Sequence, residues 1–132
     1  MSSQSRVLIA GAGIAGLAAA LAFQQRGWTV RVFERAPALR EVGAGIQLAP
    51  NGMKVLRALG LEQGALQAGF LPEALEMRMG RSGLPIFNIP IRHSAQYRWR
   101  APYLHIRRAD LVSLLARALQ ERAPGSLVLG RS

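Results

Sequence analysis

Residues 6–34 read RVLIAGAGIAGLAAALAFQQRGWTVRVFE. The apolar run at 6–10 has the composition of a strand buried on both faces of a sheet. Residues 17–25 are rich in Ala and Leu, which favours a helix, and Gly27 is suited to end it. A second strand is predicted at 29–33, where β-branched and aromatic residues dominate. A strand, a glycine-rich turn, a helix and a strand in this order predict a βαβ unit with parallel strands.

The glycines of the turn have the spacing GxGxxG, at Gly11, Gly13 and Gly16. This spacing is weak evidence alone, and its position between a strand and a helix makes it informative. In such a unit the first glycine allows a tight turn, the second lets the backbone approach a pyrophosphate, and the third lets the helix pack closely. Glu34 ends the second strand, where a carboxylate binds a ribose diol and repels a 2′-phosphate. We therefore predict a dinucleotide bound through its adenosine half, which FAD and NAD share.

The rest of the chain continues the α/β pattern. We predict a loop at 36–50, short helices at 51–59 and 62–68, an antiparallel hairpin of residues 74–79 and 84–89, an irregular loop at 90–102, a strand at 103–107, a helix at 109–122 and a strand at 126–129. Asn51 is the expected N-cap of its helix, with Val55, Leu56 and Leu59 on one face. The helix at 109–122 has the strongest apolar periodicity, with Asp110 favourably placed in its first turn. The expected fold is α/β, a Rossmann-like βαβ frame with an inserted hairpin.

Composition limits the function classes. The chain has 132 residues, half of them apolar, which is enough for the core of one domain. It has no cysteine, which excludes a disulfide, a thiolate metal site and a cysteine nucleophile. We expect no metal, since the spacing of His93 and His105 matches no metal motif.

Charge and hydropathy bear on partners and location. The net charge of +10 can indicate a nucleic-acid partner, but the basic residues are spread along the whole chain, so we expect none. Residues 7–23 carry no charge and have almost the length of a membrane span. Their clustered glycines and the folded continuation favour a cytoplasmic protein without a membrane partner.

Three further segments are VFERAP at 32–37, EVGAGIQLAPNG at 41–52 and RADL at 108–111. Together they resemble the single-component FAD-dependent aromatic hydroxylases, above all the salicylate and 3-hydroxybenzoate hydroxylases. The segment at 41–52 is the most specific of the three. One departure is Arg107, where members of that family often carry His, which puts the contacts beside Arg108 in doubt.

The resemblance implies a cofactor, substrates and roles for particular residues. FAD would be the cofactor, NADH or NADPH the transient electron donor, and a phenolic aromatic acid and O2 the substrates. Glu34 would hold the adenosine ribose, Arg35 would lie beside the adenine half, and Arg108 would contact the cofactor. The loop at 43–47, with Gly45 and Gln47, would approach the flavin. The residues that would hold the pyrophosphate are those of the glycine-rich turn: Gly11, Gly13, Ile14, Ala15 and Gly16.

Members of that family are considerably longer than this chain. Their substrate-binding sheet and an Asp-Gly and a Gly-Asp motif come later than any residue here. We therefore expect residues 1–132 to be the N-terminal part of an FAD-binding domain, incomplete and unable to hydroxylate alone, with the catalytic residues beyond residue 132. Two alternatives stay open, a fragment of an NAD-dependent dehydrogenase and a non-catalytic dinucleotide-binding module. The sequence leaves the oligomeric state open.

Overall fold

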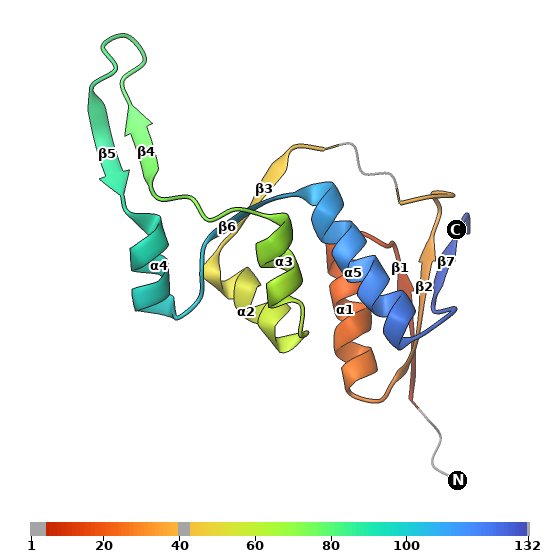
Figure 1. Ribbon diagram of the computed structural model, residues 1–132. Helices are drawn as coiled ribbons and strands as arrows, with labels where there is room; N and C mark the ends of the chain where they lie inside the picture. Colours follow the sequence, from red (N-terminus) through yellow and green to blue (C-terminus); the bar gives the residue numbers. More distant parts are fainter. Residues whose placement is uncertain (1–4, 40–42, 132) are drawn as a thin grey trace. The chain divides into compact units, whose positions relative to one another are not determined.

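A computed structural model describes residues 5–39 and 43–131 of the chain (Figure 1). Residues 41 and 42 of the segment EVGAGIQLAPNG lie outside these described residues. The chain forms two compact units. The first comprises the residues up to 44 and from 107 onward, and the second comprises residues 45–106.

The first unit begins with the expected βαβ arrangement. Strand β1 (Arg6–Ala10), helix α1 (Ile14–Gln25) and strand β2 (Thr29–Glu34) follow one another directly. The two strands are parallel, with Arg6 opposite Thr29 and Ala10 opposite Phe33. Strand β7 (Leu127–Leu129) joins β2 in parallel, so the strand order is β1-β2-β7. The prediction of a βαβ unit with parallel strands is confirmed.

Helix α1 and helix α5 (Arg108–Arg122) lie side by side against one face of this sheet (Figure 1). Alternation along β2 shows which face they cover, because Val30 and Val32 are buried and Thr29 and Arg31 are exposed. The apolar stripe predicted for α5 supplies much of the core. The buried residues of helix α5 are Leu111, Val112, Leu115, Ala116, Ala118 and Leu119.

The expectation that β1 is buried on both faces was wrong. Leu8 is 64% exposed, because it lies on the face of the sheet that α1 and α5 do not cover. The uncharged stretch at 7–23 is shared between β1 and α1. Within residues 5–39 and 43–131, no helix is both long and apolar enough to cross a membrane.

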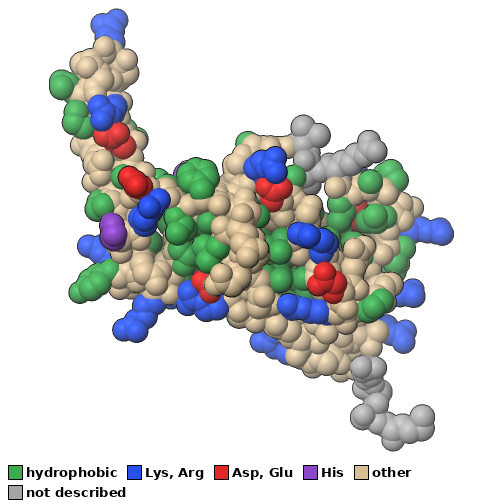
Figure 2. All heavy atoms as spheres, in the orientation of Figure 1, with side chains coloured by type: hydrophobic (Ala, Val, Ile, Leu, Met, Phe, Trp, Pro, Cys, Tyr) green, Lys and Arg blue, Asp and Glu red, His purple; other side chains and the backbone are tan. Residues whose placement is uncertain are grey.

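The second unit contains the hairpin. Strands β4 (Leu75–Arg78) and β5 (Pro85–Ile89) pair antiparallel, with Leu75 opposite Ile89. This confirms the predicted hairpin. All of β5 is exposed, and hydrophobic side chains lie on the surface of the hairpin (Figure 2).

The other elements of the second unit surround a small core. They are β3 (Gly45–Leu48), α2 (Pro50–Ala58), α3 (Glu62–Ala68), α4 (Ile91–Trp99) and β6 (Leu104–Arg107), whose last residue passes into the first unit. Strands β3 and β6 form a two-stranded sheet. The buried residues include Met53, Leu56, Leu59, Ala65, Ile91, Ala95 and Leu104.

Four details of this unit differ from the sequence prediction. The predicted loop at 36–50 contains β3, and the predicted loop at 90–102 contains α4. Helix α2 begins at Pro50 and not after an Asn51 cap, because the fixed φ of proline suits the first helical position. Val55 is 52% exposed, and Met53 takes its place in the core.

Candidate functional site

The three glycines of the turn between β1 and α1 differ in backbone conformation and in steric surroundings. Gly11 has a φ of +93°, a conformation that side chains other than glycine rarely adopt. A Cβ on Gly16 would lie 2.0 Å from the carbonyl oxygen of Gly11, so only glycine fits where α1 crosses the turn. A Cβ on Gly13 would meet no atom within 4 Å. Gly13 therefore faces open space, as a backbone approached by a ligand requires.

Among the residues that the structure describes, no side chain caps the N-terminus of α1. Gly13 is the N-cap in an extended conformation, and the first turn holds no acidic residue. The first hydrogen bond of the helix runs from the N–H of Leu17 to the carbonyl of Gly13, at 3.0 Å. The N–H groups of Ile14, Ala15 and Gly16 therefore have no acceptor within the helix. These donors and the positive end of the helix dipole form a site for an anion such as a pyrophosphate.

Glu34 lies at the carboxyl end of β2, next to this turn. Its Oε2 accepts a hydrogen bond from the N–H of Ala12 at 2.8 Å, and its Oε1 accepts one from the N–H of Ala36 at 2.9 Å. The bonds from Ala36 and then Ala12 lower the pKa of the Glu34 carboxyl below its usual value, with burial opposing the shift. Each carboxylate oxygen can accept more than one hydrogen bond, so the group still has capacity for ribose hydroxyls.

The structure places two predicted arginines in the first unit. Arg35 follows Glu34 and is exposed. Arg108 begins α5, and a Cβ on Gly43 would lie 3.8 Å from its Cδ, so the loop residue and the arginine are neighbours. Arg107 points to the first turn of α5, where its Nε and Nη2 donate to Asp110 at 2.7 and 3.0 Å. The departure at Arg107, the N-cap of α5, thus forms an ion pair with Asp110 in the first turn of that helix, and this pair raises the pKa of Arg107.

Gly45 and Gln47 belong to β3 in the second unit. A Cβ on Gly45 would lie 3.8 Å from the carbonyl oxygen of Ile106, an ordinary contact, so glycine is not sterically required here. Gln47 is exposed, and its Oε1 accepts a hydrogen bond from the hydroxyl of Tyr103 at 2.7 Å. Sequence reasoning missed Tyr103, which no motif marks and whose partner lies 56 residues away.

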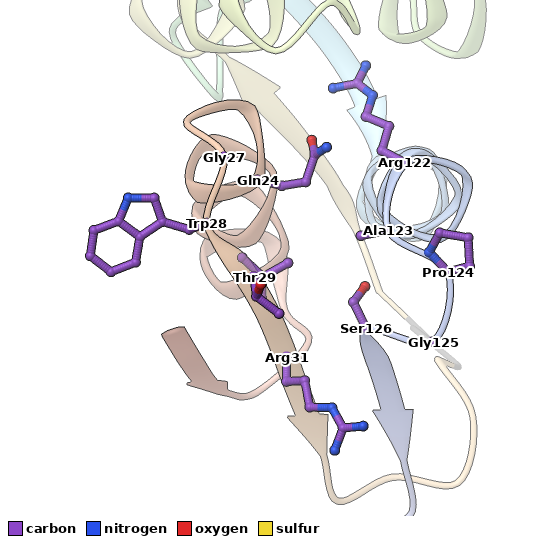
Figure 3. Close-up of a pocket in the computed structure, with 11 residues that line it drawn as sticks. Gln24, Gly27, Trp28, Thr29, Arg31, Arg122, Ala123, Pro124, Gly125 and Ser126 are labelled. Carbon is purple, nitrogen blue, oxygen red and sulfur yellow. The ribbon is translucent and has the colours of Figure 1, made fainter. Parts of the chain in front are cut away.

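A separate hollow of about 390 Å³ lies at the opposite end of β2 (Figure 3). The ends of α1 and α5, the beginning of β2 and the turn that precedes β7 line it, with Gln24, Arg31, Arg122 and Ser126 among its residues. It contains none of the predicted cofactor residues. Ligands of parallel α/β sheets bind at the carboxyl ends of the strands, where Glu34 lies, so this hollow is not the dinucleotide site.

The geometry at the carboxyl ends of β1 and β2 fits the adenosine half of a dinucleotide. The fit rests on the open backbone at Gly13, the uncapped N–H groups of α1 and the fixed carboxylate of Glu34. Eight of the predicted cofactor residues belong to the first unit: Gly11, Gly13, Ile14, Ala15, Gly16, Glu34, Arg35 and Arg108.

Known proteins similar to this chain are aromatic-ring oxygenases. The chain is 44% identical over 128 residues to 3-amino-4-hydroxybenzoate 2-monooxygenase of Streptomyces cremeus, a match that covers 96% of this chain and 32% of the relative. It is 42% identical over 114 residues to 3-hydroxybenzoate 6-hydroxylase 1 of Aquipseudomonas alcaligenes, which covers 86% of this chain and 29% of the relative.

The fold is similar to that of 2-methyl-3-hydroxypyridine-5-carboxylic acid oxygenase, with a TM-score of 0.84 and 29% identity, covering 98% of this chain and 32% of that one. The chain thus spans between 29% and 32% of the length of these three relatives. The family model described as FAD binding domain matches residues 4–127. This match confirms the predicted cofactor, and the chain belongs to the family of FAD binding domains.

Proposed function

We propose that this chain forms the adenosine-binding part of an FAD-dependent monooxygenase that hydroxylates a small aromatic acid. NADH or NADPH is the electron donor and O2 the second substrate. The observation that carries the proposal is the uncapped N-terminus of α1 beside the fixed carboxylate of Glu34. The relatives are named for hydroxybenzoates and a hydroxypyridine carboxylic acid as substrates, which supports an aromatic acid as the substrate class of this chain. In this proposal residues 1–132 correspond to the N-terminal part of an FAD-binding domain.

Each element of the site has a defined task. The N–H groups of residues 14–16 bind the pyrophosphate, and Gly11, Gly13 and Gly16 keep the backbone within reach of it. Glu34 accepts hydrogen bonds from the adenosine ribose, and Arg35 lies at the adenine side. Arg108 adds positive charge beside Gly43. When bound, FAD supplies the redox chemistry that amino-acid side chains lack.

Gly45 and Gln47 are the proposed contributions of the second unit. We assign them to the flavin side of the cofactor, because they belong to the segment at 41–52, whose resemblance to the aromatic hydroxylases implies a loop that approaches the flavin. No residue of the chain is assigned as a catalytic base. The cytoplasmic location expected from the sequence stays a prediction.

Visible absorption of the purified chain tests this function directly. The chain is mixed with FAD, desalted and scanned, and retained flavin bands are expected. NAD+ serves as the competitor, and excess NAD+ should not displace the flavin. Displacement by NAD+, or a folded chain that is colourless after desalting, would favour a dehydrogenase fragment or another dinucleotide-binding module.

The same sample tests whether these residues hydroxylate alone. NADH and 3-hydroxybenzoate are added to the chain that has retained FAD, and products are separated by chromatography. We expect no hydroxylated product. A dihydroxybenzoate that forms in proportion to the protein concentration would contradict this expectation.

A further inference from the structure

A hollow of about 290 Å³ in the second unit has no task in the proposal above. It is lined by Ala49, Pro50, Asn51, Ile91, Trp99 and Tyr103. Two of these residues are aromatic, three are aliphatic and none carries a charge. A cavity of about 150 Å³ already accommodates benzene when its walls are apolar. This hollow therefore has room for one aromatic ring with substituents.

The walls of the hollow are held in place by contacts outside it. Arg57 on α2 donates from Nη1 to the carbonyl of Arg100, the residue after Trp99, at 3.0 Å. The other two guanidinium nitrogens of Arg57 donate to both carboxylate oxygens of Glu62, each at 2.7 Å. The end of α4 is thus tied to α2. A ligand entering between them meets a preformed site, which is typical of small-molecule pockets.

Two side-chain amides bear on the polar end of the hollow, because Asn51 lines it and Gln47 is hydrogen-bonded to the lining residue Tyr103. The Oε1 of Gln47 accepts from the hydroxyl of Tyr103 at 2.7 Å, and the Oδ1 of Asn51 accepts from the N–H of Gly52 at 2.9 Å. Both acceptor atoms are therefore engaged within the protein. The two NH2 groups remain as donors, and both side chains belong to exposed residues. A ligand group that accepts hydrogen bonds, such as a carboxylate, suits this polar end.

We propose that this hollow binds a monocyclic aromatic carboxylate, with its ring against Trp99 and Tyr103 and its carboxylate toward the amides of Gln47 and Asn51. The choice of an aromatic acid rests on the proposed function, and the site itself rests on the second unit alone. Tyr103 is a positioning residue in this arrangement, because its hydroxyl fixes which end of the Gln47 amide faces the ligand. The competing occupant of the hollow is the ring system of a flavin, whose three fused rings are larger than one substituted ring.

Indole N–H signals in the NMR spectrum of the full, isotopically labelled chain test the site. The chain has two tryptophans, Trp28 and Trp99. Trp28 belongs to the first unit, with its ring centroid 5.1 Å from that of Phe23, and is an internal reference. A Trp28→Phe variant assigns the two signals. Titration with 3-hydroxybenzoate should shift the Trp99 signal to saturation and leave Trp28 unchanged. No shift at Trp99, or equal shifts at both, would overturn the proposal.

Two variants test the carboxylate end of the site. Tyr103→Phe keeps the ring and removes the hydroxyl that holds Gln47, and it should weaken 3-hydroxybenzoate binding roughly three- to ten-fold. Binding of benzyl alcohol, a neutral ring of similar size, should not change. Tyr97→Phe is the matched control, because Tyr97 is 89% exposed and does not line the hollow. Equal losses for both ligands, or none, would overturn the role of Tyr103. Asn51→Ala gives a second selective loss should Tyr103→Phe misfold.

A parallel measurement separates this inference from the proposed function. FAD retention reports mainly on the glycine-rich turn and Glu34 of the first unit, whereas the Trp99 signal reports on the hollow of the second unit. FAD retention without a Trp99 response to the acid overturns the inference and leaves the proposed function standing. A Trp99 response without FAD retention supports the hollow and counts against the proposed function. A saturating Trp99 shift with riboflavin but not with 3-hydroxybenzoate identifies the flavin as occupant and overturns the inference.

Discussion

The carboxylate of Glu34 accepts a hydrogen bond from the backbone N–H of Ala12 at 2.8 Å, across 22 positions of the sequence. Ala12 lies between the first two glycines of the turn and is only 2% exposed. The acidic residue that ends β2 therefore holds the shape of the turn, whether or not a ligand is bound. Under the proposed function, ribose recognition and phosphate recognition would therefore both depend on this one side chain.

Replacing Glu34 with Gln should affect both of these tasks. A side-chain amide has one acceptor oxygen, so either Ala12 or Ala36 loses its partner, and the charge is lost as well. We expect FAD binding to weaken roughly ten-fold or more, because charge-assisted hydrogen bonds are lost. Fluorescence titration measures the affinity, and amide hydrogen exchange at Ala12 and Ala36 should become faster. Glu121→Gln, an exposed acid on α5, is the control, and unchanged exchange at both alanines would contradict the prediction.

The lowered pKa of Glu34 predicts how the turn responds to acid. Hydrogen bonds from Ala36 and Ala12 favour the ionised form, so the folded-state pKa lies below the ordinary 4.5. The stabilisation is complete above 4.5 and is lost as the pH falls through the folded-state value. NMR shifts of the Ala12 amide should therefore titrate below pH 4.5. The titration should disappear in Glu34→Gln, and its persistence there would assign it to another group.

Replacing Gly16 with alanine should mainly reduce stability, whereas replacing Gly13 with alanine should mainly reduce FAD binding. A Cβ at Gly16 would lie 2.0 Å from the Gly11 carbonyl oxygen, so Gly16→Ala should lower the free energy of unfolding by about 1–3 kcal/mol or more. A Cβ at Gly13 meets no atom within 4 Å, so Gly13→Ala should fold normally and lose FAD binding. Thermal unfolding and flavin retention, measured on both variants, check this pair. A Gly13→Ala chain that binds FAD normally would show that the cofactor does not approach the turn closely.

Leu115 tests the packing of α5 on the first unit. Its side chain is fully buried, and Leu115→Ala should lower the free energy of unfolding by about 2–5 kcal/mol. Leu8→Ala is the matched control, since Leu8 is 64% exposed on β1, and its effect should stay within about 1 kcal/mol. Urea unfolding of both variants provides the measurement. A large effect at Leu8 would mean that the open face of the sheet is covered in solution.

The elements predicted correctly are those with strong local signals. The βαβ unit follows from adjacent segments, and α5 follows from its apolar stripe, which includes Leu111, Leu115 and Leu119. Strand β3 was missed because it has four residues and pairs with the distant β6. Helix α4 was missed because it buries only Ile91 and Ala95, too few for a visible periodicity.

The candidate site also contains one part that the sequence predicts and one part that it does not. The glycines and Glu34 are visible as a motif, and their local geometry is what that motif requires. The link from Glu34 to Ala12 and the hydroxyl of Tyr103 at Gln47 were not visible. Both are contacts between residues far apart in sequence, and only the folded chain shows which side chains meet.

The exposed hairpin has a consequence for the behaviour of the protein at high concentration. Leu84, Ile86, Phe87 and Ile89 are all at least 42% exposed, and residues 84–89 carry no charge. Such a β-strand can pair edge to edge with other copies, and the prolines at 85 and 90 limit how far that pairing extends. Self-association of this chain should therefore start at β5, and a single charge placed at Phe87 should raise the concentration at which light scattering first increases.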